Sequence, residues 1–539
     1  MHRDSESETY KKRRLRMNVP LSVFCIAILA ACLPVRSVTA QPANDDRGRY
    51  FSRKEFTPEV FPVWDACKAW LPRPVLEADP GWVEMYWKCW ELAFDHLRRP
   101  EPGTPFVSNY IDEAFNDNIF QWDTIFMVMF WRYAQHIFPA VQSFDNFYCR
   151  QHSDGFICRE IRETGARAGE DYHLKTSSQA INPPLFSWAE TEYYRVSGDK
   201  RRFETVLPVL EKYAEWLEAN RVKTSARHGL YWQTGLGSGM DNTPQTGSAW
   251  VEMSAQMVIQ YNDLAFMAEE IGLPEKAKIY RTRAKDITEK MNQLMWDEMA
   301  GFYWNLDDDN VQQKCKAIGF SWTLLAGIPS AEQAERLAEN LMDPDLFYRK
   351  IPFASLSADS PGYDPHGGYW LGSSWAPTTY QAIKGLQRYG YEEHATAASE
   401  KYLAGMYEVF RKTGTVWENY APDFPEPGNN SRKDFVGWSG CGPIALLLEN
   451  VIGLRPNAVH SRIVWHLHRT DRHGVEGLVI GNATLTLLCE KRQSADDPAA
   501  LTLKSDKPFQ VIVVHSNGTE TIDLKTGTTR MVVGAAHPE

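Results

Sequence analysis

The chain has 539 residues, of which 43% are hydrophobic and 12% are aromatic, with 19 Trp among them. This length is enough for two or three domains that each bury a sizeable core. The formal net charge of −11 at pH 7 argues against a nucleic-acid partner, which would require basic surface. The Trp content suits a sugar-binding cleft, although a Trp-rich core would give the same count.

Residues 1–40 have the pattern of an export signal. Basic residues cluster at 11–16, an apolar run follows from Val19, and Val-Thr-Ala at 38–40 fits a small-residue cleavage site. Alternatively, Leu-Ala-Ala-Cys at 29–32 resembles a bacterial lipobox, which would make Cys32 a lipid-bearing N-terminus. Both interpretations place the protein in the periplasm or outside the cell. No later apolar run has the length of a membrane span, so we expect no integral span in the mature chain.

The sequence predicts no cofactor. Seven Cys lie beyond the signal region, and their wide spacing and odd number show no zinc pattern. Cys149 and Cys158 either pair or remain buried thiols. The acidic turn at 307–310 offers carboxylates to a structural calcium ion, but it lacks the Gly and the distal Glu of an EF-hand loop.

Residues 106–455 have the pattern of paired helices. Apolar residues between Phe203 and Leu217, and again between Ala277 and Leu294, recur at the spacing of one helix face. Glycine turns separate the members of each pair, and the long connections between pairs carry Gly, Trp and acidic residues. This arrangement predicts a helical toroid with a cleft where the connections meet. A solenoid is the alternative, but its repeats would be more alike.

The segments on either side of 106–455 differ from it. Residues 41–105 form a lead-in with one aromatic helix at 82–96, which we expect to pack on the helical region. Residues 456–539 alternate in polarity or are rich in β-branched residues, with Gly, Asn and Asp turns between the runs. They predict a small C-terminal β domain, with hairpins at 517–518 and 525–527.

Two connections each hold one carboxylate in an aromatic frame. The first, at 229–244, is too rich in glycine for a helix; it contains Asp241, and Pro244 fits the start of the next helix. The second, at 414–422, leaves a helix and contains Glu418. Glycoside hydrolysis needs such a pair, because one carboxylic acid protonates the departing oxygen while another carboxylate activates water. Composition alone cannot pair these two, since 69 Asp and Glu are present.

Five motifs between about 110 and 445 resemble, in order, those of the family 63 and family 37 glycoside hydrolases. These families include processing α-glucosidases, trehalases and bacterial mannosylglycerate and glucosylglycerate hydrolases. The motifs are Gln-Trp-Asp-Thr at 121–124, Asn-Pro-Pro-Leu at 182–185, Gly-x-Gly-Met-Asp-Asn-Thr-Pro at 237–244, Gly-Gly-Tyr-Trp-Leu-Gly-Ser-Ser-Trp at 367–375, and Trp-Glu-Asn-Tyr at 417–420 followed by Gly-Trp-Ser at 437–439. The resemblance implies an (α/α)6 barrel.

The resemblance also implies an exo-acting, inverting α-glycosidase that acts on an oligosaccharide or a small glycoside. Asp241 would be the general acid and Glu418 the general base, about 6.5–9.5 Å apart with a water between them. The substrate-binding candidates are Trp122 and Asp123 for the terminal sugar, Trp370, Trp375 and Trp438 as pocket walls, and Arg159, Glu160, Trp232, Asn242 and Trp417. Each Trp also fits simple core packing.

Two features depart from the family pattern. Leu371 stands where many relatives have Arg, so the donor fork of a guanidinium is missing there. Arg159 and Glu160 either bind a polar or acidic sugar group or form a surface ion pair. Two further functions stay open at this stage, a non-catalytic glycan-binding lipoprotein and a polysaccharide lyase on a helical toroid.

Overall fold

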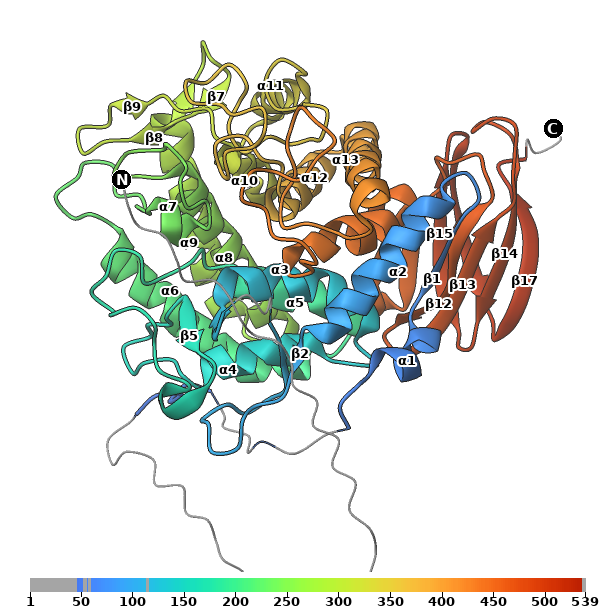
Figure 1. Cartoon of the computed structure of the whole chain (residues 1–539), viewed down its shortest axis with the longest axis horizontal. Helices are drawn as coiled ribbons and strands as arrows, with labels where there is room; N and C mark the ends of the chain where they lie inside the picture. The colour runs from blue at the N-terminus through green and yellow to red at the C-terminus, as the bar shows by residue number, and fades with distance from the viewer. Residues whose placement is uncertain (1–45, 52–55, 57–59, 113–115, 536–539) are drawn as a thin grey trace, which may run out of the picture. The chain divides into compact units, whose positions relative to one another are not determined.

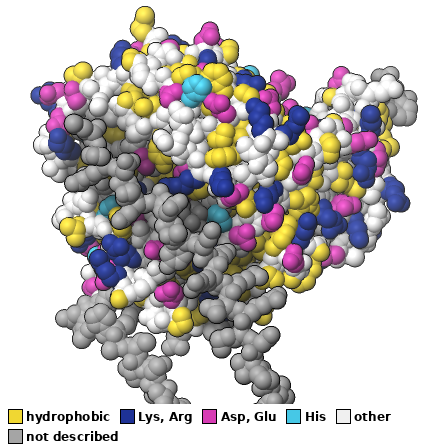
Figure 2. Space-filling view, viewed as in Figure 1, with side chains coloured by type: hydrophobic (Ala, Val, Ile, Leu, Met, Phe, Trp, Pro, Cys, Tyr) yellow, Lys and Arg dark blue, Asp and Glu magenta, His cyan; other side chains and the backbone are white. Residues whose placement is uncertain are grey.

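The computed structural model of the protein describes residues 46–51, 56, 60–112 and 116–535 (Figure 1). The predicted signal at 1–40, with its alternative lipid anchor at Cys32, lies outside these residues. No helix in the described part of the chain is long and apolar enough to cross a membrane. Acidic and basic side chains are interspersed over the face shown in Figure 2.

Helices dominate the chain up to residue 452. The longer helices are α2 (Pro80–Asp95), α3 (Gln121–Trp131), α5 (Phe186–Ser197), α6 (Arg201–Arg221), α8 (Val251–Glu270), α9 (Pro274–Leu294), α11 (Ala331–Met342), α12 (Ala376–Arg388), α13 (Glu392–Thr413) and the π-wound η7 (Gly442–Val451). The shorter ones are α1 (Trp64–Cys67), α4 (Asp145–Tyr148), α7 (Gly235–Ser238), α10 (Trp322–Ala326), η1 (Lys68–Trp70), η2 (Arg132–Ala134), η3 (Ala140–Phe144), η4 (Gly165–Arg167), η5 (Ile318–Ser321), η6 (Trp438–Cys441) and η8 (Ala458–His460).

The predicted helical pairs are confirmed. Helices α5 and α6 are separated by Gly198, and α13 ends at Gly414, both in the left-handed conformation that glycine adopts without strain. Helix α9 buries only the positions that its spacing predicts, including Ala277 and Ile287, so it has one solvent-facing side. All residues of α3 are buried, so α3 is surrounded by protein.

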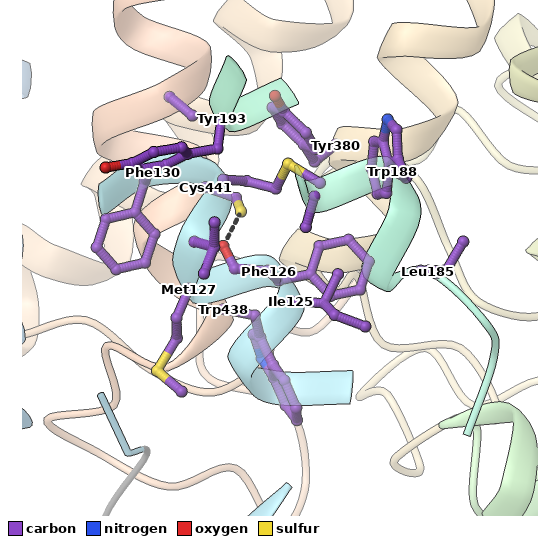
Figure 3. Close-up of a cluster of buried hydrophobic side chains, with 14 of the residues drawn as sticks. Ile125, Phe126, Met127, Phe130, Leu185, Trp188, Tyr193, Tyr380, Trp438 and Cys441 are labelled. Carbon is purple, nitrogen blue, oxygen red and sulfur yellow. Dashed lines mark hydrogen bonds between the residues drawn. The ribbon is translucent and has the colours of Figure 1, made fainter. Parts of the chain in front are cut away.

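A ring of contacts connects the inner helices among the described residues. Helices α3, α5, α8, α10 and α12 contact one another in turn, and η6–η7 contacts both α12 and α3. Aromatic and sulfur-containing side chains from several of these helices fill the centre (Figure 3), where Cys441 Sγ donates a hydrogen bond of 3.2 Å to the carbonyl of Phe126. Trp438 lies at one end of this cluster, and Phe130 and Tyr193 lie at the other.

The C-terminal region is made of strands, as predicted. One sheet has the order β1-β12-β13-β14-β17 and the other β10-β11-β15-β16. Their strands are β1 (Arg73–Leu76), β10 (Leu454–Asn457), β11 (Arg462–His466), β12 (His473–Ile480), β13 (Ala483–Cys489), β14 (Ala499–Ser505), β15 (Phe509–His515), β16 (Gly518–Leu524) and β17 (Gly527–Val533). Short ladders also join the helical connections: β2 (Leu97–Arg98) with β3 (Tyr110–Ile111), β4 (Asn118–Phe120) with β5 (Glu160–Arg162), β6 (Trp296–Asp297) with β7 (Phe302–Tyr303), and β8 (Asn305–Leu306) with β9 (Gln312–Gln313).

Some local expectations were wrong. The turn at 525–527 is not a hairpin, because β16 pairs with β15 while β17 crosses to the other sheet and pairs with β14. The Gly-rich connection includes one helical turn, α7, which Thr234 caps by accepting a hydrogen bond of 3.1 Å from the Gly237 amide. Pro244 does not start a helix, since α8 begins at Val251.

Strand β1, from the lead-in, pairs with β12 of the C-terminal region.

Cys158 is a buried free thiol, so Cys149 and Cys158 do not pair with each other.

Candidate active site

Asp241 lies in a connection that is packed closely against α3. Gly239, two residues before it, has φ of +81°, and a Cβ added there would lie 2.8 Å from the Trp122 ring. Only glycine combines this backbone conformation with so close an approach. The glycines of this connection therefore bring Asp241 next to the N-terminal end of α3.

Glu418 lies in a loop that folds back on itself. The Glu418 amide donates to the carbonyl of Arg432 at 2.9 Å, and the Arg432 amide donates to Glu418 Oε2 at 3.2 Å. The indole of Trp438 donates to the Glu418 carbonyl at 2.9 Å. These bonds fix both the backbone and the carboxylate of Glu418, and they place the Arg432 guanidinium 3.7 Å from Glu418 Oε1.

Both carboxylates open into one cavity of about 140 Å³, which we call the acidic pocket. It lies where α3, α5, α12 and η6–η7 begin, because its lining residues come from those helix starts and from the connections before them. These residues are Phe120, Trp122, Asp123, Arg159, Asn182, Gly239, Asp241, Tyr369, Trp370, Glu418, Arg432 and Trp438.

The pKa values of all three acids in this pocket are raised, although only Asp123 and Glu418 are buried and the Asp241 side chain is exposed to solvent. The pKa of Asp123 is raised well above its usual value by burial, with Glu418 and Asp241 adding repulsion. The surrounding protein likewise raises the pKa of Asp241 by excluding water, while Arg159 and Arg432 oppose the shift. For Glu418 burial again raises the pKa, Arg432 opposes it, and Asp241 adds to it. The two candidate catalytic groups thus act on each other, as carboxyls that share a site do.

Several polar atoms of the pocket wall have no hydrogen-bond partner among the described residues. They are Trp122 Nε1, Asp123 Oδ1 and Asn182 Oδ1, and all three side chains are buried. Buried polar groups in native proteins are nearly always satisfied. One donor and two acceptors in a small cavity suit the hydroxyl groups of a sugar.

Aromatic rings form one wall in two layers. Trp370 lines the pocket, and Trp375 stacks behind it with ring centroids 4.0 Å apart and an angle of 2° between the planes. Trp438 also lines the pocket and meets Trp375 edge-on at 5.7 Å. Tyr369 has φ of +65°, which is unusual for a residue with a side chain and is held by its carbonyl bond to Trp375 Nε1.

Five of the predicted site residues do not line the pocket. Trp375 supports Trp370, and Asn242 accepts from the Trp370 amide at 2.8 Å. Glu160 accepts from Asn118 and contacts His173, both at 3.0 Å, beside Arg159. The remaining two lie outside the lining: the Arg221 guanidinium covers Trp232 at 4.1 Å, and Trp417 donates from its indole to Thr413.

Sequence reasoning did not select several lining residues. Arg432 and Asn182 are the polar ones, and Phe120, Gly239 and Tyr369 complete the set. Asn182 and Tyr369 lie inside motifs that the sequence singled out. A signal for Arg432 was also present, because Gly428 marks a turn that brings the later part of the loop back to Glu418. Leu371 does not line the pocket. The two cationic side chains that do line it are Arg159 and Arg432.

Comparison with known proteins identifies the family. The sequence model described as "Mannosylglycerate hydrolase MGH1-like glycoside hydrolase domain" matches residues 116–436. This range is more than half of the chain and contains most of the acidic pocket. The protein therefore belongs to this family of glycoside hydrolases.

Individual relatives agree with this assignment. An uncharacterized protein of Borreliella burgdorferi is 26% identical over 442 residues, which cover 79% of this chain and 90% of that protein. A mannosylglycerate hydrolase of Rubrobacter radiotolerans is 26% identical over 199 residues, covering 35% of this chain and only 40% of the relative. The crystal structure of the GH63 mannosylglycerate hydrolase of Thermus thermophilus superimposes with a TM-score of 0.54 at 19% identity, covering 67% of this chain and 99% of that one. At that identity, the structural likeness supports the fold alone.

Proposed function

We propose that the protein is an exo-acting, inverting α-glycosidase built on an (α/α)6 barrel, with Asp241 as general acid and Glu418 as general base. The observation that carries this proposal is that both carboxylates, from separate connections, open into one small cavity beside Asp123. The closed ring of inner helices, with α6 and α9 packed against α8 and with α13 packed against α12, supports the barrel.

The surroundings of the two acids favour these roles. The raised pKa of Asp241 keeps its proton available for the departing glycosidic oxygen. Glu418 accepts a backbone hydrogen bond from Arg432 and lies near its guanidinium, and both interactions favour the ionised form that a base needs. In the proposed step, Asp241 gives its proton to that oxygen as the bond to the anomeric carbon breaks. A water attacks the same carbon from the opposite face and passes a proton to Glu418.

The size of the acidic pocket supports exo action. Its 140 Å³ is well below the roughly 300 Å³ at which pockets for drug-sized ligands begin. A single terminal sugar suits this volume, with Trp122, Asp123 and Asn182 offering their open polar atoms to its hydroxyls. The Trp370 ring offers an apolar face to the C–H side of the same sugar.

The names of the relatives suggest the first substrates to test, trehalose and mannosylglycerate. We propose a screen of these two compounds, other α-linked disaccharides and aryl α-glycosides, with the product anomer resolved by NMR before mutarotation. The expected result is release of one sugar in the β configuration from an α-linked substrate. An attacked sugar released as the α anomer would contradict inversion; for trehalose, whose leaving group is itself α-glucose, this means two α-glucose molecules and no β-glucose. An ultraviolet-absorbing unsaturated product would indicate a lyase.

We also propose that the protein is exported. The basic and apolar segments at 11–40 support this, as does the similarity, 24% over 180 residues, to a periplasmic trehalase of Xanthomonas campestris. Expression of the full chain in a bacterial host, followed by cell fractionation and N-terminal sequencing, tests it. A mature N-terminus at Gln41 would support cleavage after Ala40, and a lipid-modified Cys32 would support the alternative. An uncleaved chain in the cytoplasm would contradict both.

A further inference from the structure

A second cavity lies at the opposite ends of the helices that form the acidic pocket. Its volume is about 370 Å³, and it is lined where α3, α5, α12 and η7 end and where β10 and β11 pass. Because α3 has 11 residues and α12 has 13, about 16–20 Å of helix separates the two sites. We call this second site the basic cavity, because its charged lining residues include five cations: Arg132, Arg195, Lys384, Arg388 and Arg455.

The carboxylates of the basic cavity are too few to neutralise these cations. Glu449 binds two of them, Arg132 at 2.6 Å and Lys384 at 3.0 Å. Glu192 is also shared, between Arg132 at 2.5 Å and Arg195 at 3.2 Å.

The remaining carboxylate of the cavity, Glu392, pairs with Arg455 at 2.9 Å. Arg388 forms no ion pair with any described residue. Among the lining residues, five cations therefore face three carboxylates. Asp263 does not line the cavity but is a further carboxyl near it, whose pKa is raised by burial and lowered by Arg195 and Arg388.

Unpartnered guanidinium nitrogens and lowered pKa values also indicate an excess of positive charge in this cavity. Arg132 Nε and Arg455 Nη1 are buried and have no hydrogen-bond partner in the described part of the chain. Burial lowers the pKa of Lys384; Glu449 and Glu192 oppose this shift, while repulsion from Arg455 and Arg132 adds to it. The pKa of His466 is lowered by burial and then by Arg455.

The helix ends account for part of the excess positive charge in the basic cavity, because terminal carbonyls attract cations. At the end of α5, however, the Val196 carbonyl already accepts hydrogen bonds from Gln135 Nε2 at 3.0 Å and from the Gly481 amide at 2.7 Å.

We propose that the basic cavity binds a dianionic oxyanion of the phosphate class, either free or as a small phosphomonoester. Arginine donors form paired, charge-assisted hydrogen bonds to phosphate oxygens. Arg195 and Arg388 are exposed at the rim, where an anion enters, while Arg132 is buried and Lys384 is partly buried. The site lies apart from the acidic pocket, so it goes beyond the glycosidase activity proposed above.

Isothermal titration calorimetry of the full chain with inorganic phosphate and, separately, glycerol phosphate tests the proposal. Sodium chloride at matched ionic strength serves as the control titrant. We expect saturable binding at one site, and at least a tenfold loss of affinity in Arg388→Gln, which removes the cation without an ion pair. The tighter of the two ligands identifies the source of the phosphate group.

The matched control is Arg411→Gln, which removes an exposed arginine of α13 that forms no ion pair among the described residues and does not line the cavity. Its affinity for phosphate should equal that of the unmodified protein. Equal affinity in Arg388→Gln, or the same heat from sodium chloride, would overturn the proposal. Glu418→Gln should bind phosphate normally, and loss of binding there would place the anion in the acidic pocket instead. Turnover enters none of these readouts, so the glycosidase proposal can fail independently.

Discussion

The pKa values of lining carboxylates are shifted in opposite directions at the two ends of the inner helices. In the acidic pocket, at the helix starts, the pKa values of Asp123, Asp241 and Glu418 are all raised. In the basic cavity, at the helix ends, burial alone would raise the pKa of Glu449, but Lys384 and Arg132 lower it to about 2. Burial acts in the same direction at both ends, so the neighbouring charges decide the outcome.

This difference separates reactive acids from structural ones. A carboxyl among other carboxyls holds a proton at higher pH and can exchange it, which is what acid–base catalysis requires. A carboxylate between guanidinium and ammonium groups stays ionised and fixes its neighbours. The helix dipoles favour the same distribution of charged side chains, because helix starts favour negative charge and helix ends favour positive charge.

The largest expected effect is on turnover at the acidic pocket. Asp241→Asn and Glu418→Gln each remove a proton-transferring group while keeping its shape. We expect kcat to fall by about 10³-fold or more, on the scale known for general acids and bases, with unchanged thermal unfolding. Steady-state kinetics and circular dichroism measure the two quantities. Near-normal rates in either variant would refute the assigned roles.

The second effect is on stability at the basic cavity. Glu449→Gln leaves Arg132 and Lys384 without their shared anion, and breaking a buried ion pair in this way costs about 3 kcal/mol or more. Chemical denaturation should therefore show a lower free energy of unfolding, in contrast to the two acidic-pocket variants. Glu298→Gln, at an exposed pair with Arg336, is the control and should unfold like the unmodified protein. Equal stability of the two variants would contradict the comparison.

The third effect is the pH dependence of that stability. The pKa of Glu449 is about 2 when folded, against a usual value of 4.5, so its ionised form stabilises the protein fully above pH 4.5. This contribution is lost as the pH falls from 4.5 towards 2. The stability gap between the unmodified protein and Glu449→Gln should be constant at about pH 6 and 7 and should narrow below 4.5. A gap that stays constant down to about pH 3 would refute the lowered pKa.

The smallest expected effect is a shift of the pH–rate profile. The Arg432 charge lowers the pKa of both Asp241 and Glu418, so Arg432→Gln should raise both values. The acidic limb of kcat/KM, which reports the base in the free enzyme, should move to higher pH by a few tenths of a unit or more. Lys433→Gln removes the next cation along the chain and should leave the limb in place. A shift in both variants would point to general surface charge instead.

Sequence patterns anticipated the helical pairs because these depend on local spacing, whereas the motif residues were anticipated through their resemblance to known glycoside hydrolases. The 3.6-residue period places Ala277 and Ile287 on one buried face whatever packs against it. The role of Trp375 as a support behind Trp370, and the return of Arg432 to Glu418, depend instead on how loops fold in space. No local period encodes them, and the five-against-three charge pattern of the basic cavity joins residues that are hundreds of positions apart.

The pairing of β1 with β12 has a consequence for how the protein folds. Arg73 and Glu476, which face each other across these strands, are 403 positions apart. At a synthesis rate of about 5–20 residues per second, β1 waits roughly 20–80 s for its partner to be made. Contacts of such long range slow folding. The C-terminal sheet that contains β1 can therefore be completed only once nearly the whole chain has been synthesised.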